Sequence, residues 1–349
     1  MPSIHWNQVH SNPLASLKIL CLATLQSIPV LLQGLFVPCR LRPLGFRNAL
    51  ARVWLGNIFS IQGTILYSPA QDHCEQKIEG SDFEAYIIPS TNTAELQEAD
   101  AIVIFAHGGG MIFGHPLQYT KTYRRWTAYA QKLGKRLVFV SVRYPLSATR
   151  KWPAQRDSML ATYLWVLQNG VSPNRVVFAG DSAGGNLATL TMLNLRDTSS
   201  SVNLPRPASA VLLSPWFDMT CAQTLSSKNV RNDMLFHFDA TVSFLNDTLR
   251  PNNLPFDTPE ISSLLADSVA GLPPHLVVYS STEILASDSK RWCDRCRAAN
   301  IEVTEVALEG EMHTFAVGWP ICSSPVQVKC DKLICDYIID HYTISLFQN

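Results

Sequence analysis

Residues 175–195 read RVVFAGDSAGGNLATLTMLNL, and this stretch carries the strongest fold signal in the chain. A β-branched run leads into a glycine-rich turn and then into a helix-like segment, which is the order that a nucleophile elbow requires. The pattern places Ser182 at the turn, after Asp181, and directs the N-terminus of the following helix toward it. Gly180 and Gly184 agree with this prediction, because larger side chains would not fit in so tight a turn.

A second glycine-rich turn, His107-Gly108-Gly109-Gly110, follows another apolar run. Glycine lets the backbone approach a substrate carbonyl closely, so we expect the amides of Gly109, Gly110 and Ala183 to form an oxyanion hole. A turn that binds nothing and a phosphate loop are the alternatives. The second lacks the Lys-Ser/Thr ending of a P-loop and the third glycine of a dinucleotide-binding turn. We expect His107 to anchor this loop through hydrogen bonds, not to transfer protons.

From about residue 60, short β-branched runs alternate with helix-like stretches. This alternation is typical of an α/β fold with a mostly parallel sheet and crossover helices. Strands are predicted at residues 61–67, 83–89, 101–106, 136–142, 175–179, 208–213, 275–280 and 301–307. The first two are expected to be antiparallel because no long crossover separates them. Helices are predicted at residues 122–133, 156–168, 186–195, 288–299 and 326–341.

Two regions depart from the alternation. Residues 1–60 contain no strand pattern, and residues 216–270 form a long segment rich in Asn, Asp, Ser and Pro. We therefore expect a catalytic domain at residues 61–349, with residues 216–270 as an insertion that joins the N-terminal segment in a lid.

A serine needs a base to become a nucleophile, and that base needs a third group to orient it. Of nine histidines, His313 lies in a loop after the last predicted strand, where it would project over the carboxyl edge of the sheet. This position gives the chain order serine, acid, histidine. The alternative role for His313 is to cap its loop. Other histidines are less well placed, before the serine, in the insertion, in a strand or in the last helix: His107, His115, His237, His275 and His341.

The acid of such a triad should follow the strand predicted at 275–280. Glu283 comes first, at the end of the strand, and Asp288 follows five residues later. Asp288 lies where a helix begins, so capping or the helix dipole explains it without catalysis. We predict Glu283 as the acid and keep Asp288 as the alternative.

Charge and cysteine content exclude several classes of protein. The formal net charge is +0, which does not fit a nucleic-acid binder and favours an uncharged small-molecule ligand. The nine cysteines are odd in number and scattered, which favours reduced thiols and an intracellular site. Cys293 and Cys296 form a CxxC within a predicted helix, with no second ligand pair, so neither a metal site nor a redox motif is expected.

The N-terminal segment is apolar and basic. Residues 19–37 carry no charge, and residues 1–70 contain five Lys or Arg but no Asp or Glu. Residues 14–38 could therefore associate with a membrane surface, although polar residues, Pro29 and Gly34 make the run a poor span. The preferred alternative is a helical lid over an apolar pocket. The expected location is the cytoplasm, or a membrane on its cytoplasmic or ER side, without secretion, because no clear signal-peptide cleavage site is present.

The motifs HGGG, RYPLSATRKWPAQRDSMLATYLWV, GDSAGGN, VLLSPWFDMT, ADSVAGLPPHLVVYSSTEILASDS and EGEMHTF occur in the order of the hormone-sensitive-lipase-like α/β-hydrolases. This resemblance spans about residues 100–320 and rests on several motifs together. The chain looks similar to the fungal branch with steryl acetyl hydrolases and natural-product esterases, where the acid can be Glu. The resemblance implies an eight-stranded, mainly parallel sheet, a helical lid, a Ser182, Glu283 and His313 triad, and ester hydrolysis without a cofactor.

Some positions differ from the family pattern. Met111 stands where the family usually has an aromatic residue, and Tyr144-Pro145-Leu146-Ser147-Ala148-Thr149 replaces its Tyr-Arg-Leu-Ala-Pro-Glu stretch. Asp157 still matches the family's structural acid near the elbow.

The expected function is a serine carboxylesterase that hydrolyses a lipophilic ester with a short acyl group, such as acetyl, in sterol or natural-product metabolism. An acyltransferase with the same triad, or a non-catalytic small-molecule receptor on this fold, are the alternatives.

Overall fold

The computed structural model describes residues 12–62, 75–198, 204–235, 242–243, 245, 247–250, 254–318 and 320–347. One sheet of eight strands runs through the molecule in the order β1-β2-β4-β3-β5-β6-β7-β8. All neighbouring pairs from β4 to β8 are parallel, and only β1 with β2 and β2 with β4 are antiparallel. The strands are β1 Gln76–Glu79, β2 Glu84–Ile88, β3 Ala101–Ala106, β4 Leu137–Val142, β5 Val176–Asp181, β6 Ser209–Leu213, β7 His275–Ser280 and β8 Val303–Leu308.

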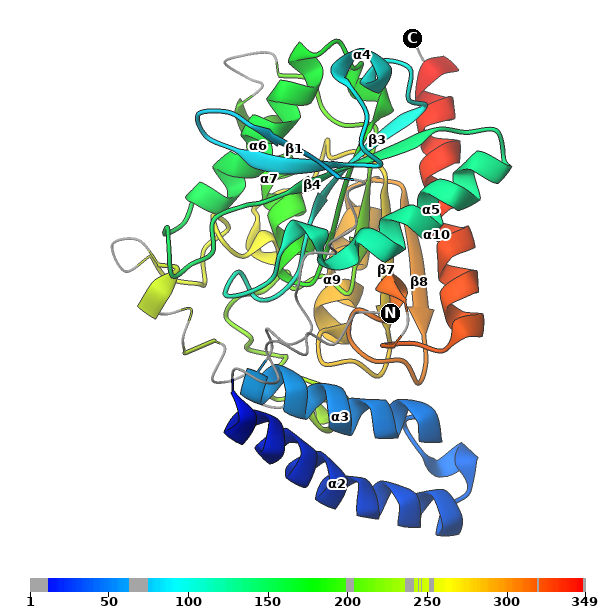
Figure 1. The fold of residues 1–349 in the computed structure, drawn as a ribbon. Coiled ribbons are helices and arrows are strands. Elements are labelled where there is room, and N and C mark those ends of the chain that lie inside the picture. The colour runs from blue at the N-terminus through cyan, green and yellow to red at the C-terminus, as the bar shows by residue number, and fades with distance from the viewer. Residues whose placement is uncertain are drawn as a thin grey trace.

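Helices cover both faces of this sheet (Figure 1). On one face lie α6, α7 and α9, and on the other α5 and α10. Each layer encloses its own apolar core against fully buried strand residues, so the sheet is covered on both sides. The helices of these layers are α5 Thr120–Lys132, α6 Ala154–Gln168, α7 Ala183–Thr198, α9 Ala286–Ala298 and α10 Ser324–Phe347, and the short α4 covers Thr93–Leu96.

The eight-stranded, mainly parallel α/β fold is confirmed, but the strand predicted at 61–67 is contradicted at its first two residues. Residues 61–62 end helix α3 (Phe46–Gln62), and residues 63–67 lie outside the described part of the chain. The first strand within the described ranges is β1, whose sequence QKIE buries only Ile78, so its apolar pattern was too short to detect. The other seven predicted strands lie within two residues of the observed bounds, and all five predicted helices are present.

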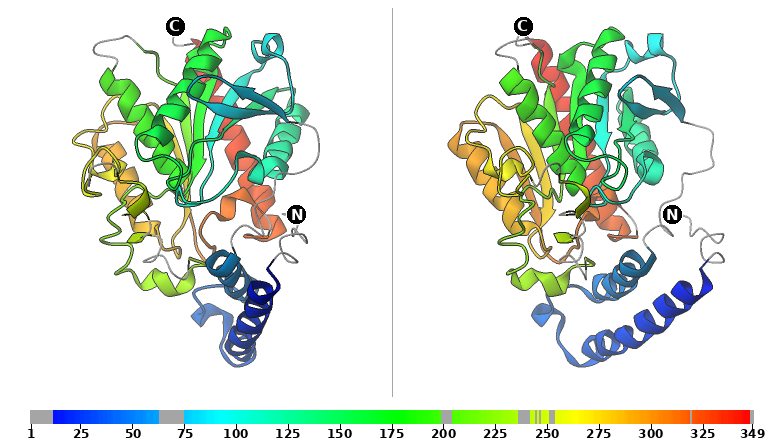
Figure 2. Two further views of the ribbon diagram at one scale, coloured as in Figure 1. Left: turned by 60° about the vertical axis from the view of Figure 1, so that its left-hand side comes forward. Right: turned by 90° about the vertical axis from the view of Figure 1, so that its left-hand side faces the viewer.

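Two helices precede the sheet and form a hairpin at one end of the molecule (Figures 1 and 2). Helix α2 (Pro13–Phe36) packs on α3, and Ala23, Val30 and Val53 form the small core between them. Helix α3 lies between α2 and the body of the molecule. Its Leu55 packs with Met234 of the insertion and Met312, the residue before His313.

The 216–270 segment has little regular structure in its described residues. It contains the short 3-10 helices Lys228–Asn232 and Ser263–Leu265, with turns and some α-helical residues at 242–248 between them. The contact of Met234 with α3 brings the insertion and the N-terminal hairpin together.

Candidate active site

Strand β5 ends at Asp181, and Ser182 forms the turn into α7. Its backbone φ of +53° lies in the left-handed region, which a residue other than glycine rarely adopts. A Cβ on Gly180 would collide with the carbonyl of Gly184, and one on Gly184 would collide with the carbonyl of Ala106. The turn therefore has the tightness expected from the sequence, and it holds Ser182 at the start of α7.

Ser182 and His313 lie side by side although 131 residues separate them in the sequence. The Nε2 atom of His313 is 2.9 Å from Ser182 Oγ, which is hydrogen-bond distance. Both side chains are buried. His313 lies in the loop after β8, as predicted, so the structure brings the predicted base to the predicted nucleophile.

Glu283 approaches the other ring nitrogen of the same histidine. Its Oε1 lies 3.6 Å from His313 Nδ1, an ion-pair distance that is longer than a hydrogen bond. Neither atom has a hydrogen-bond partner among the described residues, so each is available to the other. The second oxygen, Oε2, accepts hydrogen bonds from the Ser214 hydroxyl at 2.7 Å and from the Ser280 amide at 3.2 Å. These bonds orient the carboxylate, and catalytic contacts often tighten only when substrate binds.

Buried charges raise the pKa of His313. Burial alone disfavours the imidazolium, but the contact with Glu283 and the charges of Glu283, Asp233 and Asp181 outweigh it and raise the pKa above its usual value. Burial also raises the pKa of Glu283, against the opposing effects of His313 and Ser214. A more basic His313 is a better acceptor for the proton of Ser182.

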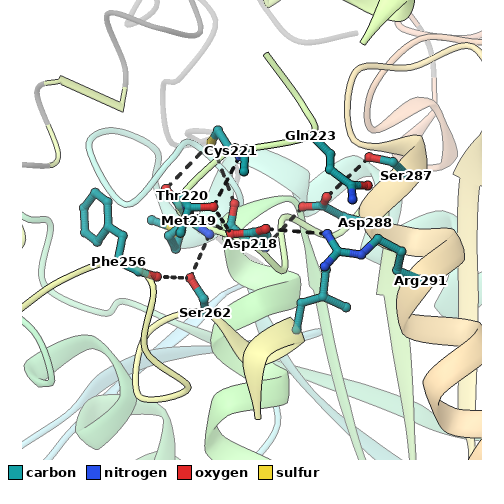
Figure 3. Close-up of polar contacts among 12 residues, drawn as sticks. Asp218, Met219, Thr220, Cys221, Gln223, Phe256, Ser262, Ser287, Asp288 and Arg291 are labelled. Atoms are coloured by element: carbon teal, nitrogen blue, oxygen red, sulfur yellow. Dashed lines mark hydrogen bonds and ion pairs between the residues drawn. The ribbon is translucent and has the colours of Figure 1, made fainter. Parts of the chain in front are cut away.

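The alternative acid, Asp288, belongs to a group of polar contacts with Asp218 and Ser287 (Figure 3). It is in the first turn of α9, and its Oδ2 accepts a hydrogen bond from the amide of Asp218 at 3.2 Å. Arg291 in turn lies 3.6 Å from the Asp218 carboxylate. Burial, and then the charge of Asp218, raise the pKa of Asp288 to about 7. In the described part of the chain, no hydrogen bond or ion pair joins Asp288 to His313, so the geometry favours Glu283 as the acid.

The residues predicted to form an oxyanion hole lie next to the elbow. Gly109 and Gly110 have φ values of +111° and +64°, which require glycine or a strained residue. The amides of Gly109, Gly110 and Ala183 have no hydrogen-bond acceptor within the described ranges of the chain. Such free amides can hold a developing oxyanion.

Asp181 ties the elbow to the HGGG loop. Its Oδ1 accepts a hydrogen bond from the Gly108 amide at 2.8 Å, and its Oδ2 accepts one from the Tyr119 hydroxyl at 2.7 Å. A Cβ on Gly108 would collide with this carboxylate. Burial raises the pKa of Asp181 to about 6, although both hydrogen bonds oppose the shift.

His107 makes several contacts within the HGGG loop. Its Nδ1 lies 2.7 Å from the carbonyl oxygen of Gly108, and Tyr144 stacks on the ring at 4.4 Å and donates a hydrogen bond to the His107 carbonyl. Burial lowers the pKa of His107 to about 4, so the ring is neutral at neutral pH. The ring therefore serves as a structural support in this loop.

Two residues of the site, Ser214 and Asp233, were not identified from the sequence. Ser214 follows β6; besides its bond to Glu283, its hydroxyl accepts a hydrogen bond from the Thr314 amide at 3.0 Å. Asp233 lies in the insertion, is fully buried and accepts a hydrogen bond from the Ile284 amide at 2.8 Å. Both hold the loop that carries Glu283. Ser214 lies within the VLLSPWFDMT motif, but that motif gave no sign of its bond to Glu283, and Asp233 belongs to no motif singled out from the sequence.

One structural role predicted from the sequence is wrong. Asp157 is exposed and pairs with its neighbour Arg156 at 2.8 Å, so it is not an acid near the elbow. Two residues earlier, Gln155 is buried, and its side-chain amide donates hydrogen bonds to the carbonyl oxygens of Pro145 and Arg150.

The CxxC pair is structural. Cys293 and Cys296 are buried, unpaired thiols on α9, and burial raises the pKa of each to about 12. No group of three His, Cys, Asp or Glu that could hold a metal ion occurs among the residues that the structure describes.

A central parallel sheet with a serine raised between strand and helix, paired with a histidine from the loop after the last strand, defines the α/β-hydrolases. The chain belongs to this family: the family model described as "alpha/beta hydrolase fold" matches residues 103–317.

Similar curated proteins are esterases. An esterase of Acinetobacter venetianus is 30% identical over 218 residues, which cover 62% of this chain and 68% of that protein. The carboxylesterase/phospholipase LipF of Mycobacterium tuberculosis is 22% identical over 334 residues, covering 95% and 83%. An acetyl-hydrolase of Streptomyces hygroscopicus is 28% identical over 188 residues, covering 54% and 59%. The chain is a carboxylic ester hydrolase.

Solved structures support the same fold. The hormone-sensitive-lipase homologue EstE7, from a metagenome library, is 22% identical with a TM-score of 0.68, and the match covers 93% of this chain and 98% of that one.

Proposed function

We propose that this chain is a serine carboxylesterase with Ser182 as nucleophile, His313 as general base and Glu283 as the orienting acid. The observation that carries this proposal is the 2.9 Å contact of His313 Nε2 with Ser182 Oγ, with a carboxylate on the opposite ring nitrogen. Such an arrangement lets the imidazole take the serine proton while the carboxylate stabilises the resulting imidazolium.

In the first half of the reaction, Ser182 Oγ attacks the ester carbonyl carbon while His313 Nε2 takes the hydroxyl proton. The carbonyl oxygen gains the negative charge, which the amides of Gly109, Gly110 and Ala183 would stabilise. When the tetrahedral intermediate collapses, His313 gives its proton to the leaving alcohol, and an acyl-enzyme remains.

In the second half, a water molecule gives a proton to His313 and attacks the acyl carbon. The second tetrahedral intermediate collapses to release the carboxylic acid, and His313 returns the proton to Ser182 Oγ. The residues present complete both halves without a cofactor. An alcohol in place of this water would turn the same site into an acyltransferase.

We propose a lipophilic ester with a short acyl group as substrate, such as an acetylated sterol or natural product. Three features support this. The chain has no net charge, the hairpin beside the site is apolar, and one relative is named an acetyl-hydrolase. A panel of p-nitrophenyl esters of increasing acyl length tests the acyl part, because a preference for long chains would contradict it.

Replacement of the nucleophile tests the mechanism. Ser182→Ala should lower kcat for p-nitrophenyl acetate by about 10⁴-fold or more, because no acyl-enzyme can form. A fluorophosphonate probe should label the wild type at Ser182 and leave the variant unlabelled. Undiminished turnover in the variant, or labelling at another serine, would overturn the assignment; no labelling of the wild type would favour a non-catalytic receptor.

A further inference from the structure

Helix α2 exposes most of its apolar surface. A narrow stripe of the helix, including Ala23 and Val30, is buried against α3. Nine large apolar side chains between Leu14 and Phe36 are instead 47–79% exposed. At 3.6 residues per turn they cover an arc of roughly 160° on the side opposite that stripe. We call this arc the outer face of α2.

The outer face differs from the rest of the surface. Outside the hairpin, the exposed large apolar side chains of the described residues are Leu133, Leu225 and Val328, which are scattered singly. A contiguous patch of this kind marks an interaction surface. Figures 1 and 2 show α2 as the outermost element of the molecule, with α3 between it and the body.

The positive charge near the outer face indicates what kind of surface binds there. Lys18 is exposed and is the one charged residue of α2. Residues 1–70 contain five Lys or Arg and no Asp or Glu. Two of these cations face the body, because Arg47 donates hydrogen bonds to the Pro320 and Ile321 carbonyls and Arg52 lies near Asp233, so Lys18 is the cation on the helix that carries the outer face. An apolar face on a basic segment matches the boundary between the headgroups and acyl chains of an anionic bilayer.

The contacts between α2 and α3 decide how such a helix would lie. By length and composition α2 could cross a membrane, and no other helix in the described ranges could. However, Gln26, near the middle of α2, accepts a hydrogen bond from Asn57 of α3 at 2.8 Å. Helix α3 is in turn fixed to the body, where Asn48 donates a hydrogen bond to the Gly310 carbonyl at 2.7 Å. A spanning α2 would pull these polar groups into hydrocarbon or break the hairpin, and both are costly.

We propose that α2 binds flat in one leaflet of an anionic membrane, with its outer face in the acyl chains and α3 on the water side. This binding does not depend on the identity of the ester. Its consequence for catalysis does rest on the proposed function. Leu55 of α3 packs against Met312, next to His313, so a docked hairpin would hold the site beside the membrane, where lipophilic esters dissolve.

Vesicle flotation of the full chain tests the docking. The protein should float with vesicles of phosphatidylcholine and phosphatidylserine, and less with phosphatidylcholine alone or at high salt. The variant Leu17→Ser/Ile28→Ser/Leu35→Ser should lose at least about tenfold in partition coefficient.

The matched control replaces three apolar residues of similar exposure outside the hairpin, Leu133→Ser/Leu225→Ser/Val328→Ser. This variant should float like the wild type. Circular dichroism checks that both triple variants fold, and Leu35→Ser alone replaces the first if it does not. The proposal is wrong if the wild type binds neither vesicle or if both variants bind equally. A concentration-dependent dimer that only the outer-face variant loses, without vesicle binding, would assign the face to a second copy.

Labels along the helix distinguish a flat from a spanning α2. Single cysteines at Leu14, Leu25 and Leu35, each labelled with NBD, are introduced into a chain with Cys21, Cys39 and Cys74 replaced by Ser. Dithionite outside the vesicles should reduce all three labels if the helix lies in the outer leaflet. Protection of the label at one end only would show that α2 spans the bilayer and would overturn the flat orientation.

Discussion

The body of the molecule and the α2 helix place leucine in opposite environments. Leu187 of α7 and Leu276 of β7 are completely buried between sheet and helices. Leu14 and Leu35 of α2 are 79% and 77% exposed. At about 25 cal/mol per Å² of buried apolar surface, the first pair stabilises the folded chain, whereas the second gives nothing until another surface covers it.

The body and the hairpin therefore contribute to the protein in different ways. The body positions Ser182, Glu283 and His313 through interactions that are complete within the chain. The hairpin adds no member of the proposed triad, but its helix α3 contacts the site, because Leu55 packs against Met312. Substitutions can therefore test whether catalysis depends on the body alone and how strongly the hairpin affects the rate.

Substitutions of Glu283 and Asp288 give the sharpest test of which carboxylate acts with His313. Glu283→Gln removes the charge beside His313 and should lower kcat/KM for p-nitrophenyl acetate by about 10³- to 10⁴-fold. Asp288→Asn leaves the histidine's partner in place and should change kcat/KM by less than about threefold. A larger loss in the second variant would show that Asp288 is the acid.

The unfolding temperature provides the control for Asp288→Asn. The pKa of Asp288 is raised to about 7 by burial, so the neutral form is favoured in the folded state. Stability from this group is present below the unfolded-state pKa of the carboxyl and decreases as pH rises toward 7. Asn stays neutral, so the variant should gain in Tm relative to the wild type between pH 5 and pH 8. An opposite trend would mean that Arg291 stabilises the ionised form.

A smaller effect is expected at Asp233, which lies between the two regions. Burial lowers the pKa of the half-buried Arg52 in α3, and the charge of Asp233 opposes this shift; together with Glu283 and Asp181, Asp233 also raises the pKa of His313. Asp233→Asn removes a negative charge, so the imidazolium becomes less stable. The acid limb of the pH profile of kcat/KM, where protonated His313 cannot act as a base, should move down by about 0.5 pH unit.

The matched control for this variant is Asp157→Asn on α6. That carboxylate is exposed and is paired with Arg156, so the limb should not move. An unchanged or upward-shifted limb in Asp233→Asn would show that Asp233 acts on the site only through the hydrogen bond to the Ile284 amide.

The parts predicted well from the sequence are governed by local rules. A buried strand, a turn that needs glycine and a helix start follow one another in residues 175–195, so Ser182 could be placed without tertiary information. Chain order then selected His313 and Glu283, because the carboxyl ends of neighbouring parallel strands meet at one edge of the sheet.

The parts that could not be predicted depend on contacts between distant segments. Ser214 and Thr314 meet only after folding, and the buried position of Asp233 depends on how an irregular insertion crosses the acid loop. Asp157 was misjudged because its motif gave the position but not the side of α6 that faces the solvent. Strand β1 has a single buried residue and therefore no detectable period.

The smallest expected effect tests the hydrogen bonds that attach the hairpin to the body. The side-chain amide of Asn48 donates hydrogen bonds to the Gly310 carbonyl at 2.7 Å and to Glu311 Oε2 at 3.1 Å, two residues before His313. Asn48→Ala leaves both acceptors without this donor and loosens the His313 loop. A single hydrogen bond contributes about 0.5–1.5 kcal/mol, so kcat/KM for p-nitrophenyl acetate should fall about threefold.

Asn57→Ala is the matched control, because it removes a contact within the hairpin instead. Asn57 donates hydrogen bonds to Gln26 of α2 and to the Val53 carbonyl, and its side chain makes no hydrogen bond to the described residues of the body. Its kcat/KM should stay at the wild-type value in steady-state kinetics without lipid. Equal losses in the two variants would mean that the hairpin affects the site as one rigid unit, and no loss in either would mean that the body holds His313 without help from α3.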